Sequence, residues 1–176
     1  MAKTYPTQAI ILKRINVNEA DRLITIFSKD YGKQKLIAKG IRKITSRKKG
    51  HLELFTLVKL LVVKGKNLDL ITEAETVASF PQLRKNLNRV RIAYLLAELI
   101  DKLTAENQEQ EAVYQLLLDN LPLLNSQEAS PDLILNFEKK LLELLGFGLP
   151  QTISRQTLET HIVSIIEKPL NSKKIR

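Results

Sequence analysis

RLITIFSKDYGKQKLIAK, residues 22–39, is the segment that most directly indicates the fold of the N-terminal half. Residues 22–27 are rich in the β-branched side chains that strands favour. The Asp-Tyr-Gly sequence at 30–32 is a turn signal of the hairpin type. Apolar residues then resume at 35–39. The stretch therefore predicts two antiparallel strands joined by a tight turn.

Three more strand candidates surround this hairpin, at 9–15, 52–63 and 68–77, and Gly-Lys-Asn at 65–67 marks a turn between the last two. Five short strands in the first eighty residues predict a small closed barrel. The OB-fold is a five-stranded barrel that binds oligonucleotides through one face and its loops. An SH3-like barrel has much the same strand count, and the pattern alone does not separate the two.

Beyond residue 81 the apolar residues follow a helical period. Those between 92 and 103 recur every three or four positions, as on one face of an amphipathic helix. Similar stripes predict helices over 113–124, over 134–145 with Gly146 at its end, and over 158–166. The sequence thus predicts an α+β protein, with a five-stranded β-barrel domain of the OB-fold or SH3-like type at 1–79 and an all-α helical domain at 80–176.

The positive charge is confined to the predicted barrel. The chain of 176 residues has a net charge of +9. Residues 1–80 hold sixteen basic and seven acidic residues, whereas residues 81–176 hold twelve of each. Nine Lys or Arg and one acid lie between positions 29 and 49. An excess restricted to one region indicates a surface that meets a polyanion.

The loop GIRKITSRKKG, residues 40–50, lies between two predicted strands and could follow a phosphate backbone. The alternative is a solvated basic loop without a partner. Of the aromatic residues, Tyr31 is a candidate for base stacking, and Phe55 is a second one for which a core position is favoured. The predicted phosphate contacts are Lys33, Lys35, Lys39, Arg42, Lys43, Arg47, Lys48 and Lys49, with Lys64 and Lys66 assisting from the next turn.

Catalysis and cofactors find little support in the residues. The chain has no cysteine, which excludes disulfides, thiol nucleophiles and cysteine-ligated metals. The two histidines lack metal-ligand spacing, and the glycines match no phosphate-binding motif. Glu19 and Asp21 are interpreted as turn or capping groups rather than as a catalytic pair. Without an apolar signal core or a run long enough to cross a bilayer, we expect a cytoplasmic protein with no membrane partner.

The order of these segments resembles a known family. AIILKRINVNEADRLITIFSKDYGKQKLIAKGIRK at 9–43 and LELFTLVKLLVVKGKNLDLITEAE at 52–75 are similar to the N-terminal part of the bacterial recombination mediator RecO. RVRIAYLLAELIDKLT at 89–104 and LNFEKKLLELLGFG at 135–148 resemble its helical domain, and EKPLNSKKIR at 167–176 resembles its usual ending. The combined order is specific, although each piece alone is not.

The resemblance implies an OB-fold domain followed by a helical domain. It also implies a protein that binds single- and double-stranded DNA, anneals complementary strands and works with RecR. With RecR, such a protein helps the recombinase RecA to load on DNA coated by single-stranded DNA-binding protein (SSB), in the nucleoid. The family binds the acidic C-terminal tail of SSB in the helical domain, where Asn136 and Lys139 lie on the expected helix.

Many members of the family carry a four-cysteine zinc module after the helix that ends near Gly146. Here residues 146–166 pass to the next predicted helix without any cysteine. The resemblance therefore implies a shortened form without zinc.

The positively charged loop at 40–50 and the resemblance together lead us to expect a non-enzymatic DNA-binding and strand-annealing recombination mediator. Two alternatives remain at this point. One is an RNA-binding OB-fold protein of translation or the ribosome, and the other is a protein-interaction adaptor with an incidental basic surface.

Overall fold

The computed structural model describes residues 3–126 and 132–174 and divides into two compact units. The first comprises Met1–Ser79 together with Glu106–Glu111, and the second comprises Phe80–Ala105 and Ala112–Arg176. The sequence pattern did not predict that residues 106–111 would group with the first unit, because they lie between two helical stripes.

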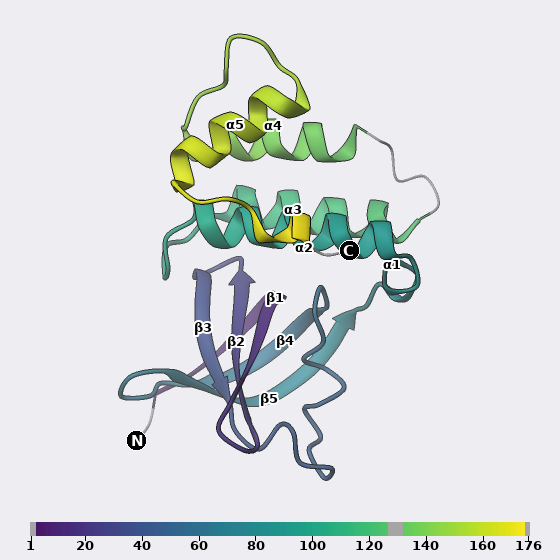
Figure 1. Cartoon of the computed structure of the whole chain (residues 1–176). Helices are drawn as coiled ribbons and strands as arrows, with labels where there is room; N and C mark the ends of the chain where they lie inside the picture. Colours follow the sequence, from purple (N-terminus) through teal and green to yellow (C-terminus); the bar gives the residue numbers. More distant parts are fainter. Residues whose placement is uncertain (1–2, 127–131, 175–176) are drawn as a thin grey trace. The chain divides into compact units, whose positions relative to one another are not determined.

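The first unit is a closed barrel in which β1 pairs with both β2 and β4 (Figure 1). Neighbouring strands are antiparallel except β3 and β5, which pair in parallel. The order β1-β2-β3-β5-β4 is that of the OB-fold, so the predicted fold class is confirmed. The strands are β1 (Thr4–Val17), β2 (Asp21–Ser28), β3 (Gly32–Ala38), β4 (Leu57–Val63) and β5 (Asp69–Ala78).

Strand β1 begins five residues before the predicted start at Ala9, because its first part closes the barrel against β4. Tyr5 and Thr7 in this part are buried. Pro6 is tolerated between them because β2 pairs only with the later part of β1, from Ala9 onward, so Pro6 has a strand on one side only.

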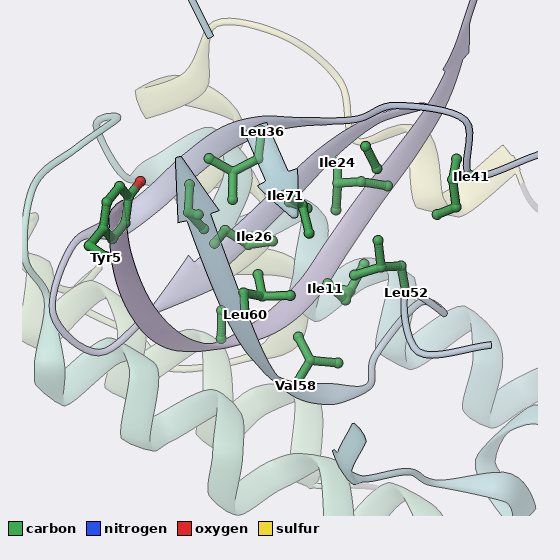
Figure 2. Close-up of a cluster of buried hydrophobic side chains, with 13 residues drawn as sticks. Tyr5, Ile11, Ile24, Ile26, Leu36, Ile41, Leu52, Val58, Leu60 and Ile71 are labelled. Atoms are coloured by element: carbon green, nitrogen blue, oxygen red, sulfur yellow. The ribbon is translucent and has the colours of Figure 1, made fainter. Parts of the chain in front are cut away.

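The barrel interior is filled by aliphatic side chains from all five strands and from the connection between β3 and β4 (Figure 2). Ile24 and Ile26 of β2 and Leu36 of β3 come from the hairpin that decided the prediction. Ile41 and Leu52 belong to the β3–β4 connection and are fully buried at one end of this cluster, whereas Tyr5 lies at the other end.

The predicted strand at 52–63 is wrong in its first part, because β4 begins only at Leu57. Phe55 has a φ of +61° and its amide donates to the Ile11 carbonyl over 2.9 Å, which turns the chain before the strand. The Ile11 amide in turn donates to the Thr56 carbonyl over 3.1 Å. Leu52 and Phe55 are both buried although they lie in a loop, so their apolar pattern resembles that of a longer strand. As predicted, Phe55 is a core residue.

The second unit is helical and follows the predicted stripes. Asn86 caps α2 by accepting from the amides of Asn88 and Arg89, and Gly146 ends α4 with a φ of +74°. Among the described residues no helix is long and apolar enough to span a membrane. The helices are α1 (Pro81–Arg84), α2 (Leu87–Leu103), α3 (Glu111–Asn125), α4 (Leu133–Leu145), α5 (Arg155–Ile166) and the short 3₁₀ helix η1 (Asn171–Lys174).

Glu98 of α2 holds the start of η1. Its two carboxylate oxygens accept from the amides of Asn171, over 2.8 Å, and Ser172, over 2.7 Å. These amides are donors that the first turn of a helix leaves without partners. Burial acts to raise the pKa of the Glu98 carboxyl, but these hydrogen bonds outweigh it and leave the pKa below its usual value.

We expect Glu98→Gln to lower the free energy of unfolding by about 1–2 kcal/mol at pH 7, since hydrogen bonds to a charged acceptor are lost. The pKa of Glu98 is lower in the folded protein than in the unfolded chain, where it is about 4.3. The stabilisation by Glu98 is therefore complete above the unfolded pKa and is lost as the pH falls through the folded pKa. Urea denaturation at pH 7 and pH 3 measures this, with the exposed Glu143→Gln as control. If the difference in free energy of unfolding between wild type and Glu98→Gln were as large at pH 3 as at pH 7, the stabilising role of the charged Glu98 carboxylate would be contradicted.

Candidate nucleic-acid interface

The cations predicted to contact phosphate are concentrated in residues 39–50, which we call the basic loop; it opens the connection between β3 and β4. Its start is tied to the β1–β2 turn. The Gly40 amide donates to the Asp21 carboxylate over 2.7 Å, and the Arg42 amide donates to the Ala20 carbonyl over 2.9 Å. Gly40 has a φ of +64°, a backbone conformation that favours glycine. The hydrogen bond from Gly40 also lowers the pKa of the Asp21 carboxyl, so Asp21 is a turn group, as predicted.

The end of the basic loop and the residues after it are tied to β5. The Lys48 ammonium group donates to the Ile71 carbonyl over 2.9 Å, and burial lowers the pKa of Lys48. Nδ1 of His51 accepts from the Thr76 amide over 3.1 Å and lies 3.0 Å from the Thr76 hydroxyl. Lys48 and His51 are therefore anchoring groups of this connection.

Strand β1 supplies a third attachment, which the sequence did not indicate. The Arg14 guanidinium donates to the Leu52 carbonyl over 3.2 Å and forms an ion pair with Glu53 at 2.8 Å. Together with the buried side chains of Ile41 and Leu52, these contacts hold the connection at both of its ends. A loop held in this way loses less conformational entropy when it binds a ligand.

Between these anchors, two turns spread the remaining cations over the surface. The Lys43 amide donates to the Gly40 carbonyl and the Ser46 amide to the Lys43 carbonyl, each over 3.1 Å. Five side chains of the basic loop are exposed and form no hydrogen bond or ion pair with any residue that the structure describes. They are Lys39, Arg42, Lys43, Arg47 and Lys49.

The other predicted contacts outside the basic loop are placed differently. Lys33 is only 6% exposed, and Lys35 forms an ion pair with Glu106. Lys64 lies 3.1 Å from the Asp69 carboxylate. Lys66, in the turn between β4 and β5, is exposed. The structure therefore brings five of the ten predicted residues together as an exposed set on one loop, with Lys66 on a separate turn.

Residues 106–111, which we call the acidic segment, pack against β3 and so reduce the access of phosphate to its lysines. The Asn107 amide donates to the Lys33 carbonyl over 2.7 Å, and Glu111 lies 3.0 Å from the Lys29 ammonium group. The backbone approaches so closely that a Cβ on Gly32 would lie 1.8 Å from the Gln108 carbonyl oxygen. No local pattern marks this segment, because its partners lie about seventy residues earlier in the chain.

We expect Glu106→Gln to raise the affinity for single-stranded DNA about two- to fivefold at low salt, because it removes a negative charge that is paired with Lys35 and repels phosphate. Fluorescence anisotropy with a labelled oligonucleotide measures the change. The exposed Glu143→Gln alters the net charge by the same amount in the helical unit and should have little effect. An equal gain in both variants would show that only net charge matters.

In the described part of the chain, no group of three or more His, Asp or Glu could hold a metal ion. The basic loop is the feature whose chemistry is clearest. The fold and this loop define an OB-fold protein that concentrates its excess positive charge on the barrel.

Two family models match the chain. Residues 1–80 match Recombination protein O N terminal, and residues 84–153 match Recombination protein O C terminal. The chain belongs to the recombination protein O (RecO) family. The resemblance noted from the sequence is thereby confirmed.

Curated relatives, each named DNA repair protein RecO, agree with this assignment. The chain is 39% identical over 145 residues to the protein of Roseiflexus sp. (strain RS-1), covering 82% of this chain and 51% of the relative. It is 36% identical over 169 residues to that of Gloeothece citriformis (strain PCC 7424), covering 93% of this chain and 60% of the relative. The chain thus spans between half and three fifths of the length of these relatives.

Proposed function

We propose that this protein is a non-enzymatic mediator of recombinational DNA repair that binds single- and double-stranded DNA through the basic loop. The observation that carries the proposal is the set of five exposed cations on a loop whose two ends are anchored to the barrel. Each cation can neutralise one phosphate and release its counterion, and this contact is independent of base sequence. Membership of a family with DNA repair relatives supports DNA as the polyanion.

Annealing of complementary strands follows from the same physics. Two single strands repel each other through their phosphates, and a positive surface screens this repulsion. Because the basic loop contacts phosphate rather than base edges, the Watson–Crick edges stay free to pair. Only 5% of the residues are aromatic, which is consistent with weak base reading.

The proposed partners are the C-terminal tail of SSB, RecR and, indirectly, RecA, and the proposed location is the cytoplasmic nucleoid. Support comes from the family and from α4, on which Asn136 and Lys139 are exposed. An exposed cation on this helix suits an acidic peptide tail.

An annealing assay tests this proposal. The protein should accelerate pairing of two complementary single strands, first bare and then coated with SSB. A version of SSB without its acidic tail should reduce the acceleration only on coated strands. Absence of acceleration on bare strands would contradict the annealing role.

Competition between single-stranded DNA and RNA of one sequence tests the identity of the nucleic acid. Equal or better binding of DNA supports the repair role, since phosphate contacts do not depend on the 2′-hydroxyl. A clear preference for RNA would instead support a role in translation. If the protein bound neither DNA nor RNA at low salt, the remaining alternative would be a protein-interaction adaptor.

A further inference from the structure

Tyr31 is held against a second tyrosine in the turn between β2 and β3. Its ring centroid lies 4.9 Å from that of Tyr5, and the two ring planes are inclined by 59°. Tyr5 is 7% exposed, whereas Tyr31 is 38% exposed, so Tyr5 supports a ring that solvent still reaches. Tyr5 lies at the end of the barrel core opposite to Ile41 and Leu52, so this ring pair is remote from the basic loop (Figure 2).

The supporting ring is fixed by hydrogen bonds. The Tyr5 hydroxyl donates to the Asp69 carboxylate over 2.8 Å and accepts from Nε2 of Gln34 over 3.1 Å. Asp69 also accepts from the Gly65 amide over 3.1 Å. The Tyr31 amide donates to the Ser28 hydroxyl over 3.1 Å, which holds the turn itself. The exposed ring therefore has a rigid base drawn from β1, β3 and the start of β5.

The β4–β5 turn brings a cation beside the Tyr5 ring. The Lys64 ammonium group lies 5.0 Å from the Tyr5 ring centroid and is paired with Asp69. Lys66, in the same turn, is exposed and forms no hydrogen bond or ion pair within the described ranges. Tyr5 thus lies near both Tyr31 and this turn. An exposed ring and an exposed cation match the two parts of a nucleotide, since the base stacks and the phosphate is neutralised.

We infer that Tyr31 is a stacking site for an unpaired nucleobase, with Lys66 neutralising the adjoining phosphate. The inference rests on the proposed function only in that the barrel binds nucleic acid. Bases in a duplex are stacked on one another and cannot cover the ring without being flipped out, which costs free energy. Tyr31 therefore favours single strands over duplexes, whereas the basic loop serves both.

The two sites lie at opposite ends of β2, whose eight residues extend about 25 Å at a rise of roughly 3.3 Å per residue. A single strand that reaches both sites runs along the barrel. An oligonucleotide too short to span this distance can contact only one of the two sites at a time.

The test compares Tyr31→Ala, Tyr31→Phe and wild type on a single strand, on a duplex and on a strand of abasic sites, which has phosphates but no bases. Tyr31→Ala should bind the single strand about five- to tenfold more weakly and should bind the duplex and the abasic strand like wild type. Tyr31→Phe keeps the ring and should match wild type throughout. The slope of log K against log salt should not change, because no charge is removed.

Phe147→Ala is the matched control, because Phe147 is a 39% exposed aromatic side chain in the helical unit. It should leave all three affinities unchanged. Equal loss of single-strand and duplex binding by Tyr31→Ala would overturn the inference, as would a loss on the abasic strand. Neither result would affect the basic loop, whose cations are tested separately by their own salt dependence.

Discussion

A variant that replaces the five exposed cations of the basic loop by alanine is expected to bind single-stranded DNA at least about a hundredfold more weakly at low salt. Each phosphate contact contributes about 0.7 to the slope of log K against log salt for single strands. Loss of five contacts should make that slope shallower by up to about 3.5. Binding isotherms over a series of salt concentrations measure both quantities. The substituted residues are Lys39, Arg42, Lys43, Arg47 and Lys49.

The matched control removes five exposed cations from the helical unit and so changes the net charge equally. Its slope should stay close to that of wild type, because these residues are not gathered on one loop. An equal loss of affinity in both variants would show that binding depends on overall charge, which would contradict an interface at the basic loop. The control residues are Lys85, Lys139, Lys140, Arg155 and Lys168.

Leu52→Ala is expected to lower the free energy of unfolding of the barrel by about 2–5 kcal/mol. The side chain is fully buried among the core residues at the end of the barrel, and its removal leaves a cavity that the surrounding strands only partly fill. Urea denaturation followed by circular dichroism measures the loss. DNA binding should also weaken, because the anchored end of the connection gains freedom that binding must then remove.

Ile44→Ala offers a control for Leu52→Ala, since it removes a similar aliphatic side chain from the same connection. Ile44 is 98% exposed, so its removal should change the free energy of unfolding by no more than about 0.5 kcal/mol. Similar stability of the two variants would mean that Leu52 does not pack into the barrel core.

Part of the candidate site could be predicted because its signals are local. The density of Lys and Arg between residues 29 and 49 is visible in the chain itself, and glycines mark the ends of the loop. The sequence could not show which of these cations are exposed and which form contacts within the protein. Lys48 and Lys49 are neighbours of the same type, yet Lys48 donates to a carbonyl of β5 while Lys49 is exposed. That difference depends on a strand more than twenty residues away.

The acidic segment and the Tyr5–Tyr31 pair show the same limit. Glu106 meets Lys35, and Tyr31 meets Tyr5, only because the barrel brings distant positions together. Sequence reasoning selected Tyr31 for its place in a turn but had no means of finding the ring beneath it. Lys33 was selected for its charge, although it is buried and its carbonyl accepts from Asn107 of the acidic segment.

Sequence alone is sufficient to predict the hairpin of residues 22–39, the change to helical period and the confinement of charge to the first half. These features arise from turn chemistry, side-chain periodicity and composition, which act over a few neighbouring residues. The folded barrel, in contrast, determines which cations face solvent, which anchor the basic loop and which are paired with the acidic segment. Burial and ion pairing depend on contacts between residues far apart in the chain, and these exist only once the barrel has closed.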